Sequence, residues 1–156
     1  MAEGKVQIFF SNSHLHNKDM EKISDYLTKN GYKCWLAKKN IPGKGLSTME
    51  RVKVVDKAID DSSIVIVGYS NPYRKSAACY KEFIYAESKN KYIIPIKLQR
   101  EYKPDGWLGL RVAAYTRLDN TNSTLFEKTM TKLLEIIKNQ PKEERYNLGT
   151  GTLTMY

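Results

Sequence analysis

The sequence predicts a three-layer α/β domain in which helices cover both faces of a five-stranded parallel sheet with strand order 2-1-3-4-5. Short apolar segments alternate about five times with segments of helical periodicity, a pattern typical of parallel sheets joined by right-handed crossovers. Residues 63–68 are almost entirely β-branched, as in a central strand buried on both faces. The 156 residues suffice for one core, so we expect one domain over residues 1–140 and a tail or linker over residues 141–156.

The expected strands are short apolar runs that end at polar or turn-forming residues. The fourth run contains Pro95, which indicates an outer position or a bulge because proline cannot donate a hydrogen bond to a neighbouring strand. The five expected strands cover residues 6–10, 32–36, 63–68, 92–96 and 114–118.

The expected helices show apolar residues at helical spacing. Asn30-Gly31 ends the first helix, Ser47 or Thr48 can cap the second, and the sequon Asn122-Ser123-Thr124 is interpreted as a cap of the last. These helices are predicted over residues 18–29, 48–59, 76–88 and 124–138, with loops over 38–46 and 102–106.

Composition excludes several classes of protein. No stretch approaches the roughly 20 apolar residues that cross a bilayer, and the N-terminus lacks a signal-peptide pattern, so we expect a cytoplasmic chain without a membrane segment. Cys34 and Cys79 fit neither a disulfide scaffold nor a zinc site, so no metal is expected. The net charge is +9, but the lysines alternate with acids. We therefore expect attraction of anionic ligands rather than nucleic-acid binding.

The predicted topology places a ligand cleft before any motif is considered. In a sheet of this order, ligands bind beyond the C-terminal strand ends, where strands 1 and 3 diverge. Those ends are residues 11–14 and 69–76. A phospho-acceptor site is excluded there, because Ser11-Asn12 and Gly68-Tyr69-Ser70 provide no acidic pocket.

Glu82 is the unusual residue of the helix that follows strand 3. Ala78, Cys79, Glu82 and Ala86 share one helical face. A carboxylate among apolar neighbours costs free energy unless it has a partner or a function. Both a structural ion pair or hydrogen bond and a functional role remain open at this point.

Residues 38–45 form a basic, glycine-rich loop that superficially resembles a phosphate cradle. The spacing of a Walker loop and of a dinucleotide fingerprint is absent. A solvated loop explains these residues equally well.

Four segments resemble the Toll/interleukin-1 receptor (TIR) domain family, together over about residues 5–138. The run Ile8-Phe9-Phe10-Ser11 is similar to the first box of the family, and Lys39-Asn40-Ile41-Pro42-Gly43 to the loop after strand 2. Ser70, Tyr73, Ser76, Cys79 and Glu82 reproduce the pattern S…Y-x-x-S-x-x-C-x-x-E, which is the most specific element. Residues 102–108 resemble a segment of invertebrate TIR domains.

This resemblance implies a flavodoxin-like fold and two alternative functions. Some TIR domains cleave NAD+ at the bond between nicotinamide and ribose, in innate immune or cell-death signalling, and others are non-catalytic modules that bind other TIR domains. The catalytic glutamate of the enzymes corresponds to Glu82. NAD+ would be a substrate, with no prosthetic group, and the product ADP-ribose or a cyclic form of it.

The resemblance and the predicted cleft together define the expected site residues. Besides Glu82, substrate contacts are expected from Ser11, Asn12, Ser13, His14, Trp35, Lys38, Lys39, Leu46, Tyr73, Ser76, Ala78 and Cys79. Self-association of TIR domains is expected through Ile41, Pro42 and Gly43, and Lys38, Lys39 and Lys44 are expected to attract the diphosphate.

Two positions depart from the NAD+-cleaving relatives. Ala78 stands where animal members often have an aromatic residue, and Ala37 where many have an aspartate. We expect Trp35 or Tyr73 to supply the aromatic wall instead. Because its neighbours are apolar, Glu82 is also expected to have a raised pKa.

Overall fold

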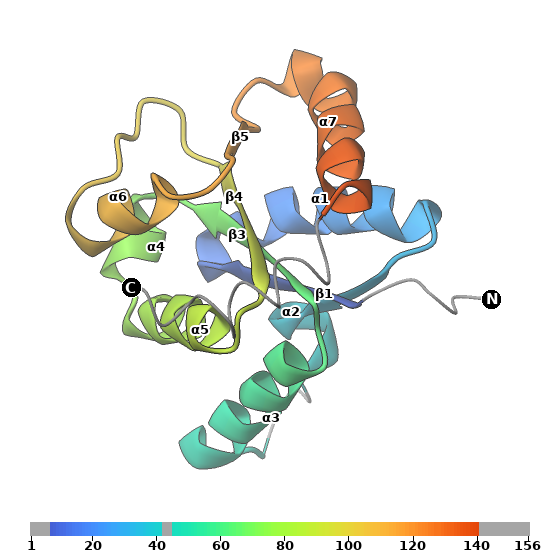
Figure 1. The fold of residues 1–156 in the computed structure, drawn as a ribbon. Helices are drawn as coiled ribbons and strands as arrows, with labels where there is room; N and C mark the ends of the chain where they lie inside the picture. The colour runs from blue at the N-terminus through green and yellow to red at the C-terminus, as the bar shows by residue number, and fades with distance from the viewer. Residues whose placement is uncertain (1–6, 42–44, 141–156) are drawn as a thin grey trace, which may run out of the picture.

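A five-stranded parallel sheet with strand order β2-β1-β3-β4-β5 forms the centre of the molecule (Figure 1). This computed structural model describes residues 7–41 and 45–140; Pro42, Gly43, Lys44 and the expected tail over 141–156 lie outside the described residues. The strand order and the helices on both faces confirm the predicted fold. The strands are β1 Gln7–Asn12, β2 Lys33–Leu36, β3 Ile64–Tyr69, β4 Tyr92–Lys97 and β5 Leu118–Asp119.

Helices cover both faces of this sheet, and each face has its own apolar cluster. Helices α1 and α7 pack on one face through side chains such as Ile23 and Leu133, against Ile8 and Ile66 of the sheet. Helices α3, α4, α5 and α6 pack on the other face. The helices are η1 His14–His16, α1 Asn17–Lys29, α2 Ala37–Asn40, α3 Thr48–Asp60, α4 Asn71–Lys75, α5 Ala77–Ser88, α6 Gly106–Val112, η2 Ser123–Leu125 and α7 Phe126–Lys138.

The predicted cap Ser47 is present and Asn30 ends α1 as expected, but the sequon Asn122-Ser123-Thr124 does not cap the last helix, since α7 has Leu125 at its N-cap with no side-chain hydrogen bond. Ser47 caps α3 in a reciprocal capping box, in which its hydroxyl accepts from the Glu50 amide at 3.1 Å and its amide donates to Glu50 Oε1 at 2.7 Å. Ser76 accepts from the Cys79 amide at the start of α5, and Asn122 caps η2. These caps fix where α3 and α5 begin, and with them the two helices that border the site described below.

The predicted fifth strand is present, but its predicted bounds of 114–118 are wrong, because β5 shares only Leu118 with them. The amides of Ala113, Ala114 and Tyr115 donate to carbonyls of α6, so this backbone closes a helical turn and cannot pair with β4. Only Leu118–Asp119 pairs with β4. Two short helices also form where none was expected: α2 overlaps the loop predicted over 38–46, and α4 lies between β3 and α5. Pro72 lies in the first turn of α4, where a missing N–H costs little.

Pro95 lies in β4, which has neighbours on both sides, and not in an outer strand. The amides of Tyr92 and Leu98 donate toward β3, so by alternation the Pro95 nitrogen faces the β5 side. Strand β5 pairs only with Ile96 and Lys97. The Pro95 nitrogen therefore faces no paired residue of β5, and at this position β4 has the free side of an edge strand.

Candidate functional site

Glu82 projects from α5 to the C-terminal end of β1. In β1, Phe9 and Ser11 point to the same face of the sheet as α5. The Ser11 hydroxyl donates to Glu82 Oε1 at 2.6 Å. The Glu82 side chain is half-buried, so one carboxylate oxygen is bound by the sheet while the residue still reaches the surface. Glu82 Oε2 accepts no hydrogen bond from the described residues.

A chain of buried hydroxyls continues behind Glu82. Ser11 Oγ lies 2.8 Å from the Tyr73 hydroxyl oxygen, which lies 3.4 Å from the Cys79 carbonyl oxygen. Ser11 and Tyr73 are both fully buried. Strand β1 and helices α4 and α5 are thus connected through three polar contacts that end at the carboxylate.

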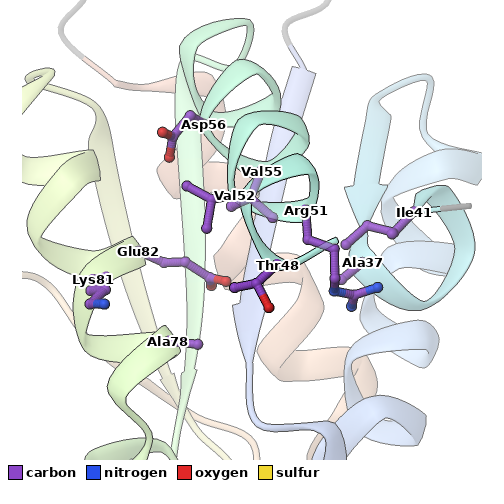
Figure 2. A pocket seen from close by; sticks show the side chains of 10 residues that line it. All are labelled: Ala37, Ile41, Thr48, Arg51, Val52, Val55, Asp56, Ala78, Lys81 and Glu82. Atoms are coloured by element: carbon purple, nitrogen blue, oxygen red, sulfur yellow. The ribbon is translucent and has the colours of Figure 1, made fainter. Parts of the chain in front are cut away.

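Two cavities meet at Glu82, with volumes of about 390 and 220 Å³. The larger lies within the range typical of small-molecule sites. Figure 2 shows it between Glu82 and Ala78 on α5 and the first turns of α3. Both cavities are lined by Ala37, Arg51 and Glu82. The larger adds Ile41, Thr48, Val52, Val55, Asp56, Ala78 and Lys81, and the smaller adds Phe9, Phe10, Asn12, His14, Asn17 and Lys38.

Burial controls the ionisation of the groups around Glu82. Desolvation raises the pKa of Glu82 from its ordinary value of 4.5 to about 7, against the opposing effect of the Ser11 hydrogen bond. Desolvation also raises the pKa of Cys79 to about 12 and that of Tyr73 well above 10. Cys79 therefore remains a thiol and is not a nucleophile at neutral pH, and Tyr73 keeps its proton.

Arg51 is the cation best placed to meet an anionic ligand. It lines both cavities, is exposed, and makes no ion pair with the described residues. Lys38 and Lys39, by contrast, contact acids of α1: Lys38 Nζ lies 3.0 Å from Glu21, and Lys39 Nζ 3.7 Å from Asp25. The expected attraction of anions by these two lysines is therefore partly neutralised.

The structure separates the expected substrate contacts into three groups. Asn12, His14, Lys38 and Ala78 line the cavities with Glu82, as does Ile41, which was expected in self-association and not as a substrate contact. Ser11, Tyr73 and Cys79 form the chain behind it. The others line neither cavity: Ser13 caps η1, Ser76 caps α5, Trp35 stacks on Phe9 with ring centroids 5.1 Å apart, and Lys39 and Leu46 lie elsewhere.

Neither Trp35 nor Tyr73 is among the described residues that line the two cavities, and the aromatic side chains that line one of them, Phe9 and Phe10, border the smaller cavity. Trp35 is occupied by its stack on Phe9, and the Tyr73 ring is fully buried. Aliphatic side chains of α3, Val52 and Val55, provide the apolar wall instead. This corrects the expectation that Trp35 or Tyr73 replaces the aromatic residue missing at Ala78.

The α3 contribution was missed from the sequence. Thr48, Arg51, Val52, Val55 and Asp56 all line the larger cavity. Their spacing, i, i+3, i+4, i+7 and i+8, places them on one helical face. That spacing, with an arginine and an aspartate inside an apolar stripe, is the signal that could have identified this wall.

The described residues contain neither a cluster of metal-binding side chains nor a helix that could span a membrane. Over 7–41 and 45–140, no three His, Cys, Asp or Glu side chains are grouped in a way that could hold a metal ion. Within the same ranges, no helix has the length and apolar character needed to traverse a bilayer.

Comparison with known proteins identifies the family. The family model of the TIR domain matches residues 8–134, whereas no curated protein sequence matches the chain. The TIR domain of the Toll-related receptor TRR-2 from Hydra magnipapillata superposes with a TM-score of 0.65 at 17% identity, covering 85% of this chain and 98% of that one. The TIR domains of the activated Roq1 resistosome give 0.63 at 16%, covering 85% and 99%.

A third solved structure has the same fold and a named enzymatic activity. It is the CMP N-glycosidase BcmB of Clostridium botulinum, with a TM-score of 0.57 at 17% identity, covering 83% of this chain and 98% of that one. At such identities the similarity shows the fold alone, while the family rests on the match over residues 8–134. The chain therefore belongs to the TIR domain family and has its flavodoxin-like α/β fold.

Proposed function

We propose that this TIR domain is an NAD+ nucleosidase that breaks the bond between nicotinamide and ribose, in innate immune or cell-death signalling within the cytoplasm. The observation that carries the proposal is the position of Glu82, a half-buried carboxylate where two cavities meet, with one oxygen held by Ser11 at 2.6 Å. The CMP N-glycosidase with the same fold supports it, because its name specifies cleavage of an N-glycosidic bond.

One carboxylate is enough for this reaction. The electron pair of the C1′–N bond moves onto the positively charged pyridinium ring, and nicotinamide leaves as a neutral molecule, so no general acid is needed. The ribose passes through an oxocarbenium-like transition state, as in glycoside hydrolysis. Ionised Glu82 stabilises that positive charge. Water then attacks C1′ and loses a proton, which gives ADP-ribose; attack by a group of the substrate itself would give a cyclic product.

The proposed orientation follows from the linings of the two cavities. The nicotinamide ring lies against Val52 and Val55 in the larger cavity, where Ala37 and Ala78 leave room. The ribose lies beside Glu82, whose Oε2 accepts from a ribose hydroxyl. The diphosphate contacts Arg51, which borders both cavities, because a guanidinium binds phosphate oxygens in a bidentate manner.

A non-catalytic TIR module that acts by TIR–TIR association is the second candidate. Two apolar side chains of α3 beside the site favour it: Met49 is 65% exposed and Val52 is 47% exposed. Exposed apolar side chains grouped on one helix are typical of association surfaces. Association with other TIR domains and NAD+ cleavage are compatible, so the experiment must separate turnover from assembly.

The test is nicotinamide release from NAD+, measured by chromatography with and without a crowding agent that promotes assembly. We expect turnover by the wild type and a loss of at least about 100-fold in Glu82→Gln, the scale seen when one stabilising group is removed from a transition state. Glu135→Gln is the matched control, because Glu135 is exposed on α7. Turnover that survives Glu82→Gln contradicts the catalytic role, and no wild-type turnover in either condition supports the second candidate.

A further inference from the structure

The hydroxyl of Tyr73 has no access to the cavities, yet it is two hydrogen bonds away from the carboxylate. Its ring is fully buried, and its oxygen lies 2.8 Å from Ser11 Oγ, which in turn lies 2.6 Å from Glu82 Oε1. A short, fully buried polar chain of this kind is costly to bury unless every member is paired. This series of hydrogen bonds ends at the Cys79 carbonyl on one side and at the Glu82 carboxylate on the other.

We infer that Tyr73 is a positioning residue that acts through Ser11 to hold Glu82 Oε1 toward the sheet, leaving Oε2 for the ligand. Strand β1 and helix α4 explain why Ser11 and Tyr73 are fixed in place. Ser11 belongs to a strand paired on both sides, and the Tyr73 amide is fixed by Ser70 at 3.2 Å in the first turn of α4. The kinetic consequences of the inference rest on the proposed function, whereas its geometry and its effect on titration do not.

The direction of the hydrogen bonds follows from a count of protons. Tyr73 and Ser11 each have one hydroxyl proton to donate. When Glu82 is ionised, Ser11 donates to it, and Tyr73 then donates to Ser11 across the shorter of its two contacts, 2.8 rather than 3.4 Å. When Glu82 is protonated on Oε1, the order reverses, so that Glu82 donates to Ser11, Ser11 to Tyr73, and Tyr73 to the Cys79 carbonyl.

Both arrangements pair every proton, but they are not equally strong. Hydrogen bonds to an ionised acceptor are stronger than neutral ones, and a donor that is itself hydrogen-bonded is more strongly polarised. The Tyr73 hydroxyl therefore favours the ionised form of Glu82. Its removal should raise the pKa of Glu82, while the Phe ring keeps the packing against Trp107.

Other charged or titratable groups surround Glu82, and the comparison must cancel their effects. They are Arg51 and Asp56 on α3, Cys79 and Lys81 on α5, Lys38 on α2 and His14 on η1. All of them remain in Tyr73→Phe and in its control Tyr80→Phe. Tyr80 lies on the exposed side of α5, 41% accessible, and likewise packs its ring on Trp107.

The experiment follows the titration of the Glu82 carboxyl carbon by ¹³C NMR, with its signal identified by its absence in Glu82→Gln. Relative to Tyr80→Phe, the midpoint in Tyr73→Phe should rise by about half to one pH unit, which is the net effect of one hydrogen bond. Ser11→Ala, which removes the direct donor, should raise it further. An equal midpoint in Tyr73→Phe and Tyr80→Phe overturns the inference.

Kinetics supply the second measurement. Below the midpoint, kcat/KM of Tyr73→Phe should fall about threefold to tenfold, as a shift of half to one unit requires, while above the midpoint KM for NAD+ stays within about twofold because Tyr73 does not touch the substrate. A midpoint shift without any wild-type turnover supports the hydrogen-bond chain and rejects the nucleosidase. Wild-type turnover without a midpoint shift supports the nucleosidase and rejects the hydrogen-bond chain. If Tyr73→Phe fails to fold, the titration midpoint of Glu82 in Ser11→Ala is compared with the midpoint in Ser62→Ala, which removes another buried hydroxyl. An equal midpoint in these two variants then overturns the inference.

Discussion

Replacement of Glu82 by glutamine should make the fold more stable at pH 8 while leaving it little changed at pH 5. The folded protein holds a proton on Glu82 up to about pH 7, whereas the unfolded chain releases it near the ordinary value of 4.5. Between these values the folded state binds more protons than the unfolded state. The contribution of Glu82 to the free energy of unfolding therefore falls as the pH rises through this window and levels off above about 7.

The size of this effect follows from the shift itself. A change from 4.5 to about 7 corresponds to about 3 kcal/mol at 1.36 kcal/mol per unit, and this is an upper limit because Glu82 is half-buried rather than enclosed. Glutamine has the same shape, its carbonyl still accepts from Ser11, and it does not ionise. The difference in stability between Glu82→Gln and the wild type should therefore grow by up to about 3 kcal/mol from pH 5 to pH 8.

Urea denaturation at several pH values measures this difference directly. All other titrating groups are common to both proteins, so their contributions cancel. Glu135→Gln, on the exposed surface of α7, should track the wild type at every pH. A difference between Glu82→Gln and the wild type that is the same at pH 5 and pH 8 would refute the reasoning, because it would mean that folding does not shift the ionisation of Glu82.

Three further predictions concern the rate, the anion contact and the cap of α3. Under the proposed function only ionised Glu82 supports cleavage, so kcat/KM for nicotinamide release should rise with pH and reach a plateau above about pH 7; a kcat/KM already flat from pH 5 contradicts this. Arg51→Gln should raise KM for NAD+ about tenfold or more, as expected for a lost charge-assisted contact, and an effect no larger than that of exposed Lys132→Gln would exclude the contact. Ser47→Ala should cost about 1 kcal/mol in urea denaturation by removing the capping box with Glu50, and an unchanged midpoint would show that the cap is not stabilising.

Most of the fold was predictable because its signals are local. Alternating strand and helix patterns gave four strands in their correct places, and the order 2-1-3-4-5 follows from the commonest way to arrange such units. The fifth strand is different. Leu118–Asp119 is a strand only because Ile96 and Lys97 lie beside it. A two-residue pairing of this kind leaves no periodic pattern in the sequence.

Only the side of the candidate site that β1 and α5 form was predictable from the sequence. Ser11 lies at the C-terminal end of β1, where the topology already places a ligand, and Glu82, in the middle of α5, follows from the motif that starts at Ser70. Arg51 lies on α3, where no motif is found, and it reaches the site because the first turns of α3 face α5 across the larger cavity. The spacing on α3 shows which of its side chains share a face, but not that this face lies opposite α5, because contacts between two helices on one face of a sheet depend on packing.

The raised pKa of Glu82 has a consequence for which ligand the site prefers. A carboxyl with a pKa of about 7 is half ionised at neutral pH, and burial makes its charge costly. Under the proposed function, the positively charged nicotinamide ring of NAD+ lies beside this group and favours its ionised form, as any neighbouring cation does. Cleavage converts that ring into neutral nicotinamide and so removes the attraction. The same carboxylate that stabilises the transition state therefore binds the charged substrate more tightly than the neutral product, and by linkage NAD+ should bind more tightly as the pH rises through 7.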